Sequence, residues 1–214
     1  MATTHESDEI AHVERSASME WGMMNEYAVV AFGVVTGIAL SAVAGVRMFL
    51  PFLVAAIAVK LGVIEVANDF AWISSWPALA VFATAALTEV LAYYIPVIDH
   101  ALDVLGSPAA IVAGSLLTAS MVIGMDEWLR WSLAIIAGGG IAGSLHVGKT
   151  LLRGASTATT AGLANPLLAT GEMIGSTLAA IAAIWIPVAV VVLAIIMLIV
   201  LIRAIIQRRN RQLV

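Results

Sequence analysis

Long apolar runs alternate with short polar joints along most of this chain. After a polar opening segment, the apolar runs cover about 27–62, 76–97, 108–124, 131–148 and 173–202. A helix crosses the ~30 Å hydrocarbon core of a bilayer with about 20 consecutive, mostly apolar residues. Runs of this length and composition predict transmembrane helices.

Two of these runs are too long for one crossing, and each contains a proline. The first run contains Pro51, which lacks a backbone N–H and clashes with the preceding helical turn. We therefore expect one span over 28–50, followed by a shorter, tilted or interfacial helix up to about Gly62. The last run would be about 45 Å long at ~1.5 Å per residue, so it must tilt or kink, and Pro187 is the expected position.

Residues 156–172, STATTAGLANPLLATGE, form a less regular segment. They are apolar enough to enter the membrane, but the segment is short and is interrupted by Gly162, Asn165 and Pro166. We expect a broken or re-entrant helix here. If this segment crosses, the fold is an all-α polytopic transmembrane helix bundle of about six crossings. If it dips in and returns, the N-terminal half has the opposite orientation.

Composition supports a membrane protein. Hydrophobic residues make up 62% and charged residues 11% of the 214 residues, whereas soluble domains carry roughly 45–50% and about 25%. The sequence divides into an acidic polar segment (1–26), a transmembrane helical domain (27–203) and a basic cytoplasmic tail (204–214). The net charge of −4 indicates no basic surface for nucleic acid, so the expected partner is the lipid bilayer.

Basic residues set the expected orientation. With six crossings both termini lie on one side, which then carries seven basic residues against three on the other, Arg47, Lys60 and Arg130. Cytoplasmic loops are enriched in Lys and Arg. We therefore expect a multi-pass protein of the bacterial cytoplasmic (inner) membrane with both termini cytoplasmic. The loops near Asp69 and Asp126 would then lie outside, where the nearby tryptophans suit an interface.

Two segments of small residues resemble each other. Residues 37–45 read GIALSAVAG and residues 140–148 read GIAGSLHVG, with Gly, Ser and Gly at four-residue spacing in both. Small residues at this spacing allow helix backbones to approach closely in a membrane, within the chain or in a homo-oligomer. Either spans 1–3 and 4–6 form a 3+3 inverted repeat, or the two segments match by chance because these residue types are frequent here.

Polar residues inside the apolar runs are candidate functional residues. A charge at membrane depth costs at least ~2.5 kcal/mol on insertion scales, so it usually faces the bundle interior or a watery cavity. Glu89 lies well inside a run, and Tyr93 follows four residues later on the same helical face, where its phenol would donate to the carboxylate. The alternative is that Glu89 pairs with a neighbouring helix for structure alone.

Three further residues are candidate charge partners. Arg47 either snorkels outward, which we favour, or pairs with Glu89 or Glu172. His146 is either a proton carrier, because imidazole titrates near neutral pH, or a packing residue. Asp99 follows the second span, where a solvated loop is expected.

The interrupted segment supplies the remaining candidate ligands. Its Asn165–Glu172 part resembles the broken helices of transporters, whose backbone exposes amides and carbonyls to a cavity. Thr159, Thr160 and Asn165 would give a cation neutral oxygens, and Glu172 would give it a carboxylate. Together with Glu89, this segment predicts a polar cavity for a proton, a cation or a proton-coupled small solute.

Enzymatic chemistry finds little support. The chain has no cysteine, which removes thiolate metal sites and cysteine nucleophiles. It also contains no phosphate-binding glycine loop, HExxH or GxSxG motif. We therefore expect no enzyme, no cofactor and no metal site.

Three stretches, GIALSAVAGVRMFLPFL, LTEVLAYYIPVIDHALD and TAGLANPLLATGE, resemble the uncharacterised bacterial integral-membrane family catalogued as domain of unknown function 4126. The likeness covers about residues 30–200. It implies no activity or substrate, but it implies that eight residues lie in recurring stretches of the family: Arg47, Pro51, Glu89, Pro96, Asp99, Asn165, Pro166 and Glu172.

Two classes of function remain. A small transporter or channel is favoured by the broken helix, the acid at membrane depth and the repeat. A non-transporting membrane scaffold or assembly factor needs only small-residue packing and the basic tail.

Overall fold

The computed structural model describes the backbone of residues 2–92, 96–160 and 163–211. Side chains are described within these ranges except at 2–21, 96–105, 165, 166, 201, 204, 205 and 208–211. The described part of the chain consists of helices joined by short connections, which confirms the predicted all-α bundle.

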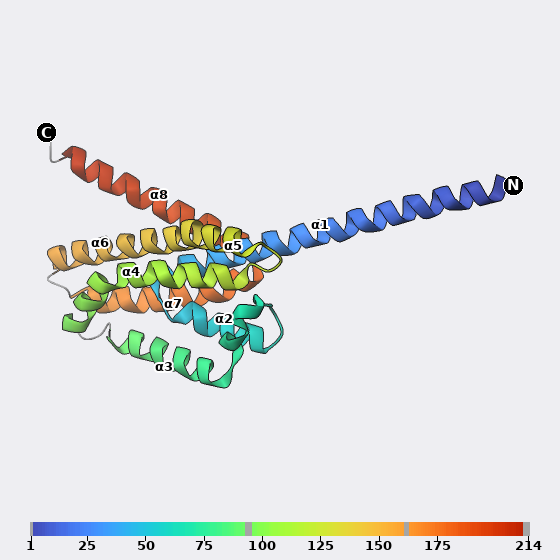
Figure 1. Cartoon of the computed structure of the whole chain (residues 1–214). Helices are drawn as coiled ribbons and strands as arrows, with labels where there is room; N and C mark the ends of the chain where they lie inside the picture. Colours follow the sequence, from blue (N-terminus) through green and yellow to red (C-terminus); the bar gives the residue numbers. More distant parts are fainter. Residues whose placement is uncertain (1, 93–95, 161–162, 212–214) are drawn as a thin grey trace.

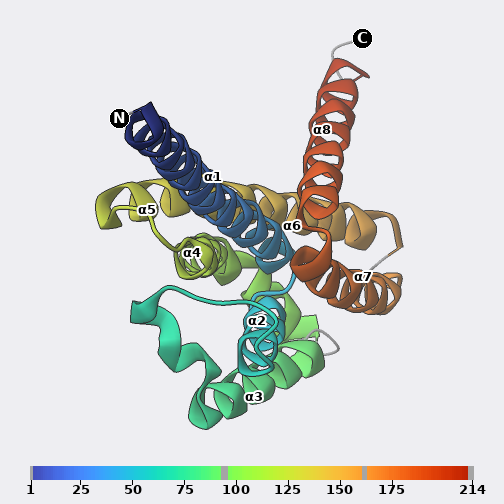
Figure 2. The same ribbon diagram turned by 90° about the vertical axis from the view of Figure 1, so that its right-hand side faces the viewer.

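The helices follow one another as α1 (Ala2–Val46), α2 (Leu50–Lys60), the 3₁₀ helix η1 (Asn68–Ser74), α3 (Trp76–Ala92), α4 (Pro96–Met121), α5 (Glu127–Leu133), the π-helical segment η2 (Ala134–Gly139), α6 (Gly140–Thr160), α7 (Asn165–Trp185) and α8 (Pro187–Arg211). The α1 helix is central, because it packs against α4, α6, α7 and α8. Figures 1 and 2 show α2 and α3 on one flank of this bundle and α8 turning away from it.

Both predicted proline breaks are confirmed. The α1 helix ends at Val46, and α2 starts at Leu50 with Pro51 in its first turn. The last apolar run is divided in the same way, since α7 ends at Trp185 and α8 begins at Pro187. At both places proline begins a new helix, where its missing N–H is not needed.

The prediction of a broken helix over 156–172 is wrong. The α6 helix continues to Thr160, and α7 begins at Asn165 with Pro166 in its first turn. This segment therefore comprises the end of α6, a short connection and the beginning of α7. Proline is well tolerated at a helix start, so Pro166 marks the beginning of α7 instead of an interruption within a helix.

Two other predicted boundaries also differ from the structure. The helix that contains the third predicted span is α4, which begins at Pro96 and has Pro108 in its interior, whereas the sequence suggested a start at Pro108. The fourth predicted span, 131–148, is part of a helical stretch that runs from Glu127 to Thr160. At ~1.5 Å per residue this stretch is about 50 Å long, so it extends well beyond one hydrocarbon core.

The first small-residue segment makes close helix contacts. A β-carbon at Gly45 would collide with the carbonyl oxygen of Ala142, and one at Gly37 would lie 2.8 Å from the Cα of Thr118. Between them, the buried Ser41 hydroxyl donates to the carbonyl of Gly114 at 2.6 Å. Small side chains thus let α1 pack directly on the backbones of α4 and α6.

The second small-residue segment packs differently. A β-carbon at Gly140 would meet no atom within 4 Å, and Ser144 is exposed. The helices that carry the two segments also run in the same direction (Figure 1). An inverted repeat requires opposite directions. The two segments therefore meet where Gly45 contacts Ala142 and Leu145, but they do not occupy the positions that the predicted inverted repeat would give them.

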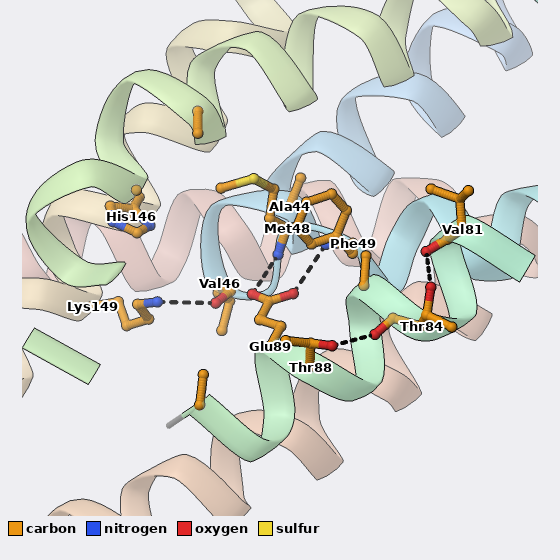
Figure 3. A pocket seen from close by; sticks show the side chains of 14 residues that line it. Ala44, Val46, Met48, Phe49, Val81, Thr84, Thr88, Glu89, His146 and Lys149 are labelled. Carbon is orange, nitrogen blue, oxygen red and sulfur yellow. Dashed lines mark hydrogen bonds between the residues drawn. The ribbon is translucent and has the colours of Figure 1, made fainter. Parts of the chain in front are cut away.

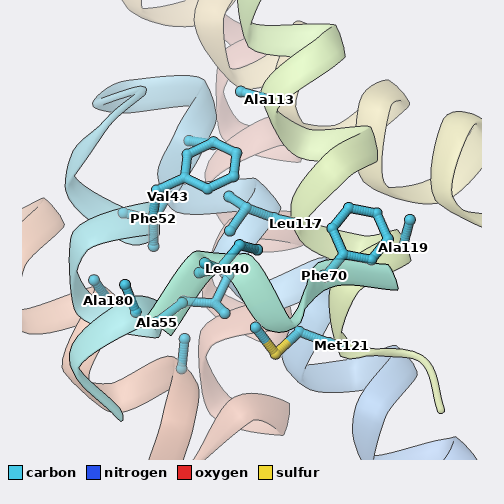
Figure 4. Packing of buried hydrophobic residues seen from close by; sticks show 14 of the residues in the cluster. Leu40, Val43, Phe52, Ala55, Phe70, Ala113, Leu117, Ala119, Met121 and Ala180 are labelled. Carbon is cyan, nitrogen blue, oxygen red and sulfur yellow. The ribbon is translucent and has the colours of Figure 1, made fainter. Parts of the chain in front are cut away.

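The hydrophobic core lies where α2, η1 and α4 meet α1 (Figure 4). Leu40 of α1 and Leu117 of α4 are fully buried, and they lie between Phe52 of α2 and Phe70 of η1 (Figure 4). Outside this core, large apolar side chains are exposed on most helices, as expected for a bundle surrounded by lipid.

Three helices are long and apolar enough to cross a membrane by length and composition: Gly22–Val46, Glu127–Thr160 and Leu167–Trp185. The bent pair η1 and α3 would make a fourth, all within the described residues. The chain is thus supported as a membrane protein with several apolar helices, but the predicted count of about six crossings is not confirmed.

One end of the bundle is defined by the two loops near Asp69 and Asp126. Arg130, at the start of the long α5–α6 stretch, pairs with Asp69 at 2.7 Å. The α1 helix passes this same end, where Val30 lies against Gly124. The beginning of α1 and the end of α8 lie at opposite ends of the fold (Figure 1). This arrangement differs from the prediction that both termini lie on the side opposite to these loops.

Candidate functional site

The break between α1 and α2 lies inside the bundle. The chain leaves α1 after Val46 and enters α2 at Leu50. Glu89, which contacts this break, lies about 20 Å along α3 from Trp76 at ~1.5 Å per residue. Where a helix is interrupted, the last carbonyls of the first helix and the first N–H groups of the second helix have no partners within either helix. Inside an apolar bundle other protein groups must satisfy these carbonyls and N–H groups.

Glu89 of α3 satisfies the N–H groups at the start of α2. The Met48 N–H donates to Glu89 Oε1 at 2.9 Å, and the Phe49 N–H donates to Oε2 at 3.1 Å. No neighbouring side chain caps α2 locally. A carboxylate at a helix N-terminus is also stabilised by the partial positive charge there. Glu89 therefore caps α2 from a different helix.

Lys149 of α6 binds the C-terminal end of α1 on the other side of the break. Its Nζ donates to the carbonyl oxygen of Val46, the last residue of α1, at 3.2 Å. The side chain is largely buried, with 6% of the residue exposed. A cation is favourable at a helix C-terminus. One acid and one base thus stabilise the two ends of the interrupted helix with complementary charges.

Arg47 lies within the break itself. Only 1% of the residue is exposed, and Nη2 donates to the carbonyl of Ala169 in α7 at 2.8 Å. The expectation that Arg47 snorkels outward is therefore wrong. The turn between α1 and α2 directs its side chain towards α7, where a guanidinium held by hydrogen bonds does not need the membrane surface.

A cavity of about 570 Å³ opens beside the break, between α3, α4 and α6. Its wall includes Met48 and Phe49 of the break and the side chains of Glu89, His146 and Lys149 (Figure 3). Most of the other lining residues are alanines and other apolar residues. This size and composition fit a small-molecule site, which is usually apolar with a few polar groups.

His146 is held at the edge of this cavity. It is 3% exposed, and a β-carbon at Gly106 of α4 would collide with its imidazole ring. The absence of a side chain at Gly106 thus makes room for the ring between α4 and α6. Of the predicted charge partners, His146 lies in the same cavity as Glu89.

Glu172 lies in a second cavity, on the opposite flank of α1. This cavity of about 610 Å³ is bounded by α1, α6, α7 and α8, and Val46 borders both cavities. The Glu172 carboxylate accepts from Arg153 Nε at 3.2 Å and Nη2 at 2.9 Å. Such a two-point pair fixes the side chains geometrically. Glu172 therefore joins α7 to α6, away from Glu89.

The remaining predicted ligands do not assemble into a site within the described residues. Thr159 donates to the carbonyl of Ala155, and Thr160 to that of Ser156, so both hydroxyls are used within α6. Neither threonine lines the two cavities beside α1. Tyr93 and the side chains of Asp99 and Asn165 lie outside the described residues.

Sequence reasoning missed Lys149 and Arg153 as site residues. Both are buried, and with His146 they stand at i, i+3 and i+7 along α6. Residues at this spacing share one helical face. Three basic or titratable residues on one face of an otherwise apolar helix were therefore a signal that this face points into the bundle.

The model of a family described as a domain of unknown function (DUF4126) matches residues 34–207. No curated protein and no solved structure matches the chain.

Proposed function

The chain belongs to the DUF4126 family, a family without an assigned function, and we propose that it is a small membrane transporter. The supporting observation is the α1–α2 break, with Glu89 on its N–H groups beside a cavity of about 570 Å³. Interrupted helices in transporters expose backbone groups to a substrate site in this way.

Protonation of Glu89 is the proposed coupling event. An ionised carboxylate is the stronger acceptor for the Met48 and Phe49 N–H groups and interacts favourably with the start of α2. A protonated Glu89 binds them more weakly and releases the start of α2. The proposed substrate is then a small solute that enters the cavity as Glu89 takes up or loses a proton.

The proposed location is the bacterial cytoplasmic membrane, with no enzymatic activity. The end of the fold that carries Arg153 and the C-terminal arginines would face the cytoplasm, because cytoplasmic segments are enriched in basic residues. The loops near Asp69 and Asp126 would then face outward, together with the N-terminal part of α1.

A flux assay tests the proposal. Purified protein is reconstituted in liposomes that contain a fluorescent pH indicator, a pH gradient is imposed, and a panel of organic acids, organic cations, amino acids and inorganic cations is added in turn. We expect at least one solute to accelerate collapse of the gradient. Glu89→Gln, which keeps the size of the side chain but cannot ionise, should reduce that rate by about tenfold.

Glu65→Gln is the matched control, because Glu65 is an exposed carboxylate away from the break. It should transport like the wild type. A Glu89→Gln variant that folds and transports at the wild-type rate would refute the coupling role. A complete absence of flux for every solute would favour the second candidate, a membrane scaffold.

The scaffold candidate is supported by the outer face of α6. A groove between α4, α6 and α8 is lined on this side by Gly139 at the end of η2 and by Gly140, Gly143, Ser144 and Gly148 of α6. Small residues at this spacing suit close packing with a further helix, including one from a second copy of the chain.

A further inference from the structure

The cavity beside Glu89 continues into a second space along α3 and α4. This neighbouring cavity has a volume of about 520 Å³ and shares Met48, Phe49 and Ala109 with the first. It leads away from the α1–α2 break towards Trp72 of η1. We call the two adjoining cavities the α3–α4 groove.

The α3–α4 groove is polar at one end only. Glu89, His146 and Lys149 all line the cavity at the break. The other cavity is lined by apolar and aromatic residues. There the Phe52 and Phe82 rings stack with centroids 5.2 Å apart, and the Trp72 ring lies 6.2 Å from that of Phe82. Such a surface matches a molecule with one polar head and one apolar chain.

The groove lies on an outer flank of the bundle. The α3 helix packs mainly against α2 and η1, and α3 residues that border the groove, such as Val81 and Thr84, are exposed. Around a membrane protein this flank faces lipid. An amphiphile therefore has a direct route into the groove from the bilayer, with its chain still in apolar surroundings.

The charges at the polar end favour an anionic head. Lys149 and, when protonated, His146 are cationic, and the start of α2 carries a partial positive charge. Glu89 is the acid among the described residues that line the groove, and each of its carboxylate oxygens already accepts a backbone N–H. A cationic head would meet Lys149 at close range, whereas an anion would be attracted to it.

We propose that the α3–α4 groove binds a long-chain carboxylate, with the head at Lys149 and the apolar chain along Phe82 towards Trp72. The inference names the substrate class of the transport proposed above and rests on that proposal for the role of Glu89. A carboxylate head replaces the Glu89 carboxylate at the Met48 and Phe49 N–H groups once Glu89 is protonated. The proton and the long-chain carboxylate then move together.

Tryptophan quenching in detergent tests binding without requiring transport. The probes are stearates that carry a nitroxide either at the methyl end or next to the carboxylate. The signal is the quenching of Trp72 fluorescence, identified as the part of the total quenching that is absent in the Trp72→Phe variant. We expect the methyl-end probe to quench Trp72 at least about threefold more strongly than the head-end probe. Unlabelled stearate should displace the methyl-end probe, while stearyl alcohol and stearylamine at equal concentration should not.

Two matched variants locate the site. Ala109→Phe places a ring at the junction of the two cavities and should abolish the Trp72-dependent quenching, whereas Ala83→Phe, on the exposed face of α3, should not. Equal quenching by both probes, equal competition by the alcohol, or unchanged quenching in a folded Ala109→Phe variant would overturn the inference. The probe and competitor comparisons use wild-type protein and therefore hold even if Ala109→Phe does not fold.

The flux assay separates this inference from the proposed function. Carboxylate-specific binding without any flux leaves the binding site established and removes the transport role. Flux of another solute, together with no stearate binding, removes the long-chain carboxylate and leaves transport in place.

Discussion

At the scale of single residues, the two related segments contain glycines with opposite surroundings. Gly45 faces the backbone carbonyl of Ala142 and has Leu145 Cβ at 2.9 Å from the position of an added methyl group. Gly140 has open space at the same position. Whether glycine is required is thus decided by the neighbouring helix and cannot be recognised from the motif itself.

This difference gives a direct comparison of two identical substitutions. Gly45→Ala should lower the free energy of unfolding by about 1–3 kcal/mol, because α1 and α6 must separate. Gly140→Ala should be neutral or stabilising by up to about 1 kcal/mol, because alanine favours the helix. Thermal unfolding in detergent checks both. Equal effects would show that the contact of Gly45 with α6 does not determine stability.

The residues of the site were predicted only in part. Glu89 could be identified because an acid stands out in an apolar run, and the structure places it beside a cavity. Its partners could not be identified, because the carboxylate accepts from backbone N–H groups that carry no sequence signature. Thr159 and Thr160 look like ligands in the sequence but bond to their own helix, which is a common alternative for threonine.

At the scale of helices, prolines were informative but ambiguous. Pro51 and Pro187 correctly predicted helix boundaries. Pro166 also begins a helix and was interpreted as an interruption, while Pro108 is accommodated within α4. Proline fixes its own backbone angle in all four positions, but tertiary packing decides whether the chain turns there.

The capping of α2 by α3 predicts a local change in dynamics. Glu89→Gln removes the charge at the start of α2, which weakens a cap worth about 0.5–2 kcal/mol. Hydrogen exchange measured by mass spectrometry should then be about fivefold faster in peptides that cover Met48–Leu53. Peptides from the centre of α4 serve as the internal control. Unchanged exchange in the α2 peptide would mean that Glu89 does not hold this helix end.

At the scale of the whole molecule, the structure predicts on which side of the membrane each loop between helices lies. The loops near Asp69 and Asp126 lie at one end, linked by the Asp69–Arg130 pair. The long stretch from Glu127 to Thr160 reaches the other end (Figure 1), where the Leu163 N–H donates to the carbonyl of Thr160 at 3.1 Å. The α1 helix enters beside the first end and its continuation α2 returns towards it, so the pair forms a hairpin (Figure 1).

Single-cysteine labelling can check this arrangement, since the chain contains no cysteine. Cysteines at the exposed positions Gly22, Asn68 and Glu127 should react with an impermeant maleimide from the same side of the membrane. A cysteine at the exposed Leu163 should react from the opposite side. Labelling of Gly22 and Asn68 from different sides would instead support a complete first crossing, as the basic residues alone suggested.

The capping of the α1–α2 break also has a consequence for biosynthesis. The groups that satisfy this break, Glu89 and Lys149, belong to helices that are synthesised after it. A nascent chain that ends before Glu89 has exposed N–H groups at Met48 and Phe49, and the short α2 cannot span the bilayer alone. We therefore expect the hairpin to reach its final position only after α3 has left the ribosome, and Lys149 to complete it when α6 follows.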